Sequence, residues 1–226
     1  MKLLALDTAT EACSAAIWID GVVLERYELA PRRHAALILP MLESVLAEAG
    51  LRIAQLDAIA VGCGPGAFTG LRIAISIAQG IAFAADLPVV PISTLAALAL
   101  GTAREVGSSH IATALDARMG EVYWGAYHAT GETVALVGEE RCCPPTAITA
   151  PPNNWFGVGS GWLAYAEALS QHCTVSAWQG NCYPRAGDVA RLAAEPTRRS
   201  AWVIAEQALP VYLRNQVASR PTVRMR

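Results

Sequence analysis

The spacing of apolar residues changes repeatedly along the first hundred positions. Short apolar runs between polar turns predict strands, and the Asp20-Gly21 pair between two of them favours a hairpin. Longer stretches with apolar residues three and four positions apart predict amphipathic helices. The expected order is three strands followed by helix, strand, helix, strand and helix, over residues 3–6, 13–19, 22–29, 34–49, 58–61, 70–85, 88–92 and 94–105. This order predicts an α/β fold with a mixed β-sheet flanked by helices.

A polar break at residues 106–109 predicts a boundary between two domains. We expect a first lobe over residues 1–106 and a smaller second lobe over residues 107–226, whose last helix packs back on the first lobe. Pro40, inside the expected helix 34–49, predicts a kink or a later helix start. The strands and helices expected in the second half cover residues 111–115, 121–127, 133–137, 155–158, 163–170, 186–194 and 202–209.

Composition adds that the chain is unusually apolar. Of the 226 residues, 54% are apolar and 16% are charged, against ~25% charged in an average soluble domain. These values exclude a disordered chain, and the net charge of −2 argues against a protein that coats a polyanion. This surplus of apolar over charged residues suggests that the chain carries more apolar surface than a self-contained soluble monomer needs.

The sequence predicts a protein of the cytoplasm without a membrane span. The longest uncharged helical stretch, residues 73–85, is shorter than the ~20 residues that cross a bilayer. The first apolar run meets Asp7 too early for a signal peptide. None of the six cysteines forms a Cys-x-x-Cys pair, so we expect reduced thiols and no zinc site.

Two segments carry candidate phosphate chemistry. The turn with Asp7, Thr8 and Thr10 offers hydroxyls to a phosphate and a carboxylate to its magnesium, or it is a plain Asx-type turn. The loop that includes Gly64 and Gly66 precedes an expected helix that Thr69 would cap. That loop either cradles an anion or makes a tight strand-to-helix connection. Its spacing fits neither a Walker loop nor a dinucleotide fingerprint.

The expected helix 70–85 is apolar nearly all round, beside the equally apolar helix 34–49. Such helices are either buried entirely in the core or offer a surface to a protein partner. Under the second interpretation the candidate interface residues are Leu37, Met41, Val45, Arg72, Ile73, Ile77 and Ile81.

Four motifs resemble the signatures of the TsaB family, also called YeaZ. They are the segments at residues 4–10, 64–72, 116–123 and 210–214, and the similarity runs through nearly the whole chain. Ala9 and Ala67 stand where that family usually has Ser.

The resemblance implies an actin-like/hexokinase-like ATPase (ASKHA) fold of two related lobes. It also implies a non-catalytic subunit required, with TsaD and TsaE, to form N6-threonylcarbamoyladenosine at position 37 of tRNAs that read ANN codons. In that family the first-lobe helices bind TsaD, and two copies pair when TsaD is absent. ATP or ADP and a metal ion then belong to the partners, this chain has no cofactor of its own, and it contacts tRNA only indirectly or weakly.

The residues themselves favour a non-catalytic chain. TsaD holds its metal through a His-x-x-x-His pair, and the matching positions here are His34 and Ile38. A kinase of this fold would have a second Asp-x-Gly-Thr turn, where this chain has Asp116 and Arg118, to which we assign no role. The alternatives are a metalloprotease or a sugar kinase of the same fold. A direct tRNA contact would use Arg214, Arg220, Arg224 and Arg226.

Overall fold

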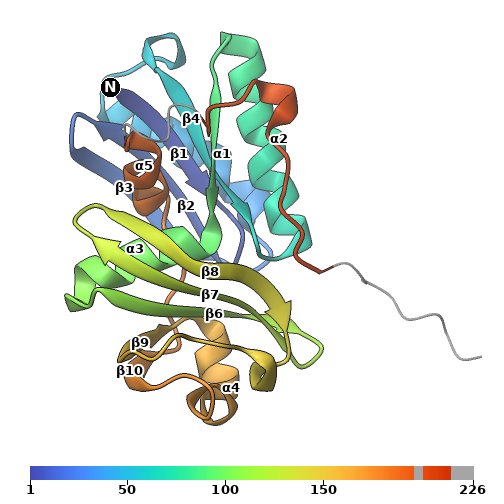
Figure 1. The fold of residues 1–226 in the computed structure, drawn as a ribbon. Helices are drawn as coiled ribbons and strands as arrows, with labels where there is room; N and C mark the ends of the chain where they lie inside the picture. The colour runs from blue at the N-terminus through green and yellow to red at the C-terminus, as the bar shows by residue number, and fades with distance from the viewer. Residues whose placement is uncertain (196–200, 215–226) are drawn as a thin grey trace, which may run out of the picture.

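Each of the two lobes is built around a five-stranded sheet (Figure 1). The computed structural model describes residues 1–195 and 201–214. The strands of the first sheet are β1 (Lys2–Asp7), β2 (Ala12–Ile19), β3 (Val22–Leu29), β4 (Ala58–Gly64) and β5 (Val89–Ser93). Their order is β3-β2-β1-β4-β5, with β1 to β3 antiparallel and β4 and β5 parallel to β1.

The second sheet repeats this arrangement. Its strands are β6 (His110–Arg118), β7 (Glu121–Thr130), β8 (Thr133–Cys143), β9 (Trp155–Val158) and β10 (Val175–Gln179). Their order is β10-β9-β6-β7-β8, with β6 to β8 antiparallel and β9 and β10 parallel to β6. Counted from its own first strand, each sheet therefore has the order 3-2-1-4-5. The prediction of mixed sheets in two related lobes is confirmed.

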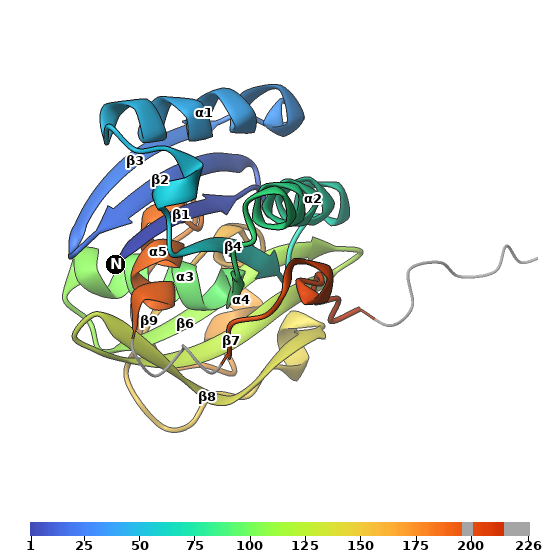
Figure 2. The ribbon, with the colours of Figure 1, turned by 90° about the horizontal axis from the view of Figure 1, so that it is seen from above.

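The helices form layers outside and between the sheets (Figure 2). They are α1 (His34–Glu48), α2 (Phe68–Ala85), α3 (Thr94–Val106), α4 (Ser160–Ser170) and α5 (Ala186–Ala194). The alternation of side chains along β1 separates two layers, because Leu4 and Leu6 share a core with α1 and α2, whereas Leu3 and Ala5 share one with α3 and α5. Helix α4 covers the other face of the second sheet.

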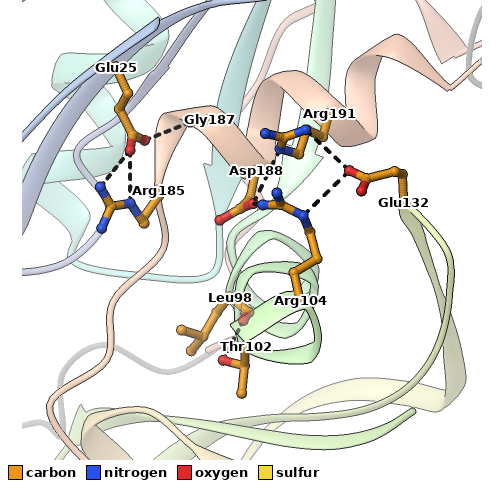
Figure 3. Close-up of polar contacts among 9 residues, drawn as sticks. All are labelled: Glu25, Leu98, Thr102, Arg104, Glu132, Arg185, Gly187, Asp188 and Arg191. Carbon is orange, nitrogen blue, oxygen red and sulfur yellow. Dashed lines mark hydrogen bonds and ion pairs between the residues drawn. The ribbon is translucent and has the colours of Figure 1, made fainter. Parts of the chain in front are cut away.

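Polar side chains join α5 to its neighbours in the middle layer (Figure 3). Arg185 donates from Nε and Nη2 to Glu25 of β3, at 2.8 and 2.6 Å. Arg104 of α3 donates to Asp188 of α5 at 3.1 Å and also faces Glu132, in the turn between β7 and β8, at 3.5 Å. Burial raises the pKa of Asp188 to about 6, although Arg104 opposes this shift. The network thereby connects the first sheet, both middle helices and the second lobe.

Helix α1 begins at His34 with Pro40 in its interior, so the expectation of a later start is wrong. Proline removes one backbone donor and places its ring over the preceding turn. Here Pro40 and Ala36 are both exposed, so the carbonyl that loses its donor meets solvent. The buried residues Ile38, Leu42 and Val45 hold the helix on the first sheet.

The prediction of a helix over residues 202–209 is wrong. Residues 202–214, hereafter the strap, run mostly extended along the first lobe with one short 3-10 turn, η4 (Ala205–Gln207). Val203 pairs with Val89 of β5 through two backbone hydrogen bonds of 2.8 and 2.9 Å. Ala205 and Ala208 are buried in the first-lobe core. These partners lie far away in the sequence, so the spacing of apolar residues within 202–209 does not contain the contacts that keep the segment extended. The local spacing alone therefore predicts a helix.

Helix α2 is long and apolar enough to cross a bilayer by length and composition, and among the described residues it alone passes that test. The sequence predicts no such span, because the uncharged stretch of this helix, residues 73–85 between Arg72 and Asp86, is shorter than the ~20 residues that cross a bilayer. About a third of the helix is buried, on a face formed by Gly70, Leu71, Ala74, Ile75, Ala78 and Ala82. This face packs mainly on β4, and the apolar character of α2 is therefore divided between core and surface.

Candidate functional site

The turn between β1 and β2 uses its polar groups within the chain. Asp7 Oδ1 accepts a hydrogen bond from the Ala9 backbone at 2.9 Å, while the buried Oδ2 has no hydrogen-bond partner among the described residues. Burial raises the pKa of Asp7 to about 7. Thr8 Oγ1 donates to the carbonyl of Gly70 at 2.7 Å, and Thr10 Oγ1 accepts from the Ala12 backbone at 3.3 Å.

The glycine-containing loop between β4 and α2 packs directly on that turn. A Cβ at Gly62 would lie 1.9 Å from Asp7 Oδ2, and one at Gly66 would lie 2.4 Å from the carbonyl of Ala9. A Cβ at Gly70 would lie 2.0 Å from the carbonyl of Thr8. These glycines therefore allow close contact between two parts of the chain, which favours the tight-connection interpretation over an open anion cradle.

Gly64 and Thr69 also differ from an anion cradle. Gly64 has a φ of +116°, and a Cβ there would lie 2.7 Å from the carbonyl of Val211 in the strap. The prediction that Thr69 caps α2 is wrong, because the N-cap position is Ala67 and no side chain caps this helix end. The backbone before α2 instead continues from β4 in an extended conformation at Ala67, which places Thr69 in the first turn.

A cleft of about 620 Å³ lies where the two lobes meet. Thr10 and Gly66 line it from the first lobe, and Asp116 and Arg118 line it from the second. Arg118 donates to Asp116 Oδ2 at 3.0 Å and faces Glu11 of the first lobe at 3.4 Å. The structure thus brings the Asp116–Arg118 motif together with the β1–β2 turn, whereas Asp7 and Thr8 lie behind the cleft wall.

The positions that match a His-x-x-x-His pair lie at the start of α1. His34 is buried, and its Nε2 has no hydrogen-bond partner in the part of the chain that the structure describes. Ile38, one turn further on, is fully buried in the first-lobe core. Over residues 1–195 and 201–214, no group of three or more His, Cys, Asp or Glu side chains could hold a metal ion.

The candidate interface residues on α1 and α2 divide into a surface set and one core residue. Arg72 is exposed, and the half-buried members are Leu37, Met41, Ile73, Ile77 and Ile81. Val45 is 0% exposed, so it belongs to the core and offers no surface to a partner. Val45 lies on the buried face of α1 together with Ile38 and Leu42, and this face packs on β2.

Three strongly exposed apolar side chains on these helices were not among the predicted interface residues. Phe83 is 73% exposed, Phe68 is 51% exposed and Leu39 is 49% exposed. For Phe68 and Phe83 on α2, the sequence contains a signal. Small residues recur there every four positions, at Gly70, Ala74, Ala78 and Ala82. Small side chains allow a helix to approach a sheet closely, and Phe68 and Phe83 lie outside this row.

The strap packs on the N-terminal end of the exposed face of α2, hereafter the α2 surface. The ring of Tyr212 stacks on Phe68 with 5.4 Å between centroids, and the Arg72 guanidinium lies 3.9 Å from the Phe68 centroid. Arg72 Nε also donates to the Tyr212 hydroxyl at 3.2 Å. Further along α2, Gln79 donates to the carbonyl of Ala208 at 3.0 Å.

The arginines considered for a nucleic-acid contact are only partly described. Arg214 donates from Nε to Glu121 Oε2 at 3.0 Å, and its side chain is partly buried. This residue is therefore engaged within the chain. Arg220, Arg224 and Arg226 lie outside the described residues.

The repeated 3-2-1-4-5 sheets and the cleft between them define the class as an actin-like/hexokinase-like ATPase fold of two related lobes. The family model described as "TsaD: tRNA N6-adenosine threonylcarbamoyltransferase" matches residues 21–195. Named relatives and a solved structure narrow the assignment, and the chain belongs to the TsaB (YeaZ) family.

The relatives match over nearly their whole length. The chain is 41% identical to the tRNA threonylcarbamoyladenosine biosynthesis protein TsaB of Escherichia coli (strain K12), over 96% of each chain. It is 40% identical to the Haemophilus influenzae protein of the same name, over 96% of this chain and 95% of the relative. The structure of YeaZ from Pseudomonas aeruginosa matches with a TM-score of 0.89 at 48% identity, covering 94% of this chain and 99% of that one.

Proposed function

We propose that this protein is a non-catalytic subunit required, with TsaD and TsaE, for forming N6-threonylcarbamoyladenosine in tRNA. The relatives named TsaB support the pathway, since their names state threonylcarbamoyladenosine biosynthesis. In this proposal α1 and α2 bind TsaD, ATP or ADP and the metal ion belong to the partner proteins, and the complex works in the cytoplasm.

The observation that carries the proposal is the outward face of α2. Phe83 is 73% exposed, and Ile77 and Ile81 of the same helix are half-buried. Exposed aromatic side chains on a helix that is already packed on its own sheet are typical of a protein interface. Arg72 adds a charged group at one end of this face, which suits the polar rim of an interface.

The non-catalytic part is supported by the β1–β2 turn. Asp7 is 1% exposed, and its oxygens face the Ala9 backbone and Gly62 rather than the cleft. A carboxylate that activates a nucleophile or holds magnesium must reach the reacting groups. The buried Ile38 supports the same conclusion for a metal site on α1.

Substitution of Phe83 tests the proposed surface. Because this side chain is exposed, Phe83→Asp should leave the fold intact while placing a charge in the interface, and co-purification with TsaD should be lost. Ile77→Asp should act in the same direction. The matched control is Val22→Asp, which changes another exposed apolar residue, 64% exposed at the start of β3.

The outcomes separate the proposal from its alternatives. Retention of TsaD by folded Phe83→Asp at the wild-type level would contradict the proposed interface. Tightly bound stoichiometric zinc, or ATP turnover by the isolated protein that Asp7→Ala abolishes, would instead favour a metalloprotease or a sugar kinase of this fold. Without TsaD we expect two copies to pair through the same surface, so Phe83→Asp should elute as a monomer in size-exclusion chromatography.

A further inference from the structure

The strap passes from the first lobe to the second across the side of the molecule that carries α2 (Figure 1). It starts at Val203, which pairs with β5, and it ends at Arg214, which contacts the start of β7. Between these points Val211 donates its backbone N–H to the carbonyl of Cys63 in β4 at 2.8 Å. One segment therefore touches the edge of the first sheet, the loop before α2 and the second lobe.

The contact with the second lobe is concentrated in one side chain. Arg214 donates to Glu121 Oε2 from Nε at 3.0 Å and from Nη2 at 2.5 Å. Nη2 also donates to the carbonyl of Arg118, the last residue of β6, at 3.2 Å. Hydrogen bonds between two charged groups are stronger than neutral ones, and the side chains of this pair are partly buried. Arg214 thus attaches the strap to both ends of the β6–β7 hairpin turn.

The same segment belongs to two surfaces at once. Val211, Tyr212 and Arg214 line the cleft between the lobes. Tyr212 also stacks on Phe68, at the N-terminal end of the α2 face. Arg118 and Glu11 also form a charged contact across the cleft, and Arg118 is mostly exposed, so we expect a small contribution from it.

We propose that the Arg214–Glu121 pair is a clamp between the lobes that holds the strap on α2. The state of the cleft and the shape of the α2 surface are then coupled. Separation of the lobes at this side breaks the clamp, and loss of the clamp releases Tyr212 from Phe68. This inference goes beyond the proposed function, because the coupling exists whether or not a partner binds α2.

Amide hydrogen exchange on the full chain tests the clamp. The reporters are the amides of Val211 and Val203, which are hydrogen-bonded to the carbonyls of Cys63 and Val89. Arg214→Gln and Glu121→Gln remove opposite ends of the same pair with little change in shape. In either variant we expect both amides to exchange at least about tenfold faster, while amides of β1 and β6 keep their wild-type rates.

The control is Arg141→Gln, which removes an exposed pair with Glu139 inside the second lobe. It should leave the strap amides unchanged. Exchange within twofold of wild type in Arg214→Gln or Glu121→Gln would overturn the clamp. An equal acceleration in Arg141→Gln would overturn it too, since the effect would then not depend on the contact between the lobes.

Discussion

At the scale of single residues, the glycines and Asp7 decide what the β1–β2 turn can do. The sequence places Asp7, Thr8, Gly64 and Gly66 in two loops but leaves open whether these loops bind an anion. The answer depends on distances between segments about sixty residues apart, which no local pattern contains. The structure brings these segments into direct contact, so the glycines act in packing.

The buried carboxyl of Asp7 predicts a pH dependence of stability. Burial raises its pKa from 3.8 to about 7, so the folded protein holds the proton more tightly than the unfolded chain does. Stability from this group is therefore present at low pH and is lost as the pH rises from about 4 to about 7. The full shift corresponds to at most about 4 kcal/mol.

Urea unfolding at pH 5 and pH 8 measures this effect. We expect the wild-type free energy of unfolding to be lower at pH 8, and the difference to shrink in Asp7→Asn. Asp188, whose pKa is raised to about 6, contributes in the same direction and remains in the variant. An unchanged difference in Asp7→Asn would show that Asp7 does not titrate in this range.

Two glycines of α2 give opposite predictions. Gly70→Ala places a Cβ against the carbonyl of Thr8, where it would lie 2.0 Å away, and should destabilise the fold by about 1–3 kcal/mol. Gly80→Ala on the same helix meets nothing within 4 Å and should stabilise it by up to about 1 kcal/mol. Thermal or urea unfolding of both variants compares them directly, and equal effects would contradict the tight contact at Gly70.

At the scale of elements, strands and helices with a strong local pattern were predictable. Residues 22–29, 155–158 and 186–194 were expected with the bounds that the structure shows. The strap was mistaken for a helix because its hydrogen-bond partners lie in β5 and α2. Strand β10 was missed because its residues are mostly exposed and form no apolar run. The local sequence pattern therefore does not predict elements that are defined by tertiary contacts.

The strap also carries a prediction at this scale. If Arg214 and Glu121 hold it in place, both Gln variants should weaken the Tyr212–Phe68 contact, which is part of the α2 surface. Partner affinity should then fall in parallel with the faster exchange of the Val211 amide. Faster exchange with unchanged affinity would keep the clamp but separate the strap from the binding surface.

At the scale of the whole molecule, the layered architecture accounts for much of the apolar surplus. Helix α3 lies between the two sheets, and nine of its thirteen residues are buried. Helices covered on both sides need few charged residues, so the low charge content does not by itself measure an interface. Part of the apolar surface that remains exposed lies on α2, at Phe68 and Phe83.

Function could be predicted from sequence only through the family resemblance, because the loops themselves left several chemistries open. The motifs at residues 4–10, 64–72 and 116–123 indicated the family, and relatives over 96% of the chain confirm it. The exposed residues of α2 could be identified only from the structure, because the face that α2 presents to solvent depends on how the helix packs on β4.

The most direct test of the proposed function is reconstituted threonylcarbamoyladenosine formation on tRNA, with TsaD and TsaE held constant and this protein varied. We expect activity to require this chain, and Val22→Asp and Asp7→Asn to support it as well as wild type does. Phe83→Asp should need at least about tenfold more protein for half-maximal activity, because it weakens binding and leaves the partner's chemistry intact. Equal activity of Phe83→Asp and wild type at limiting protein would contradict the proposed function of the α2 surface.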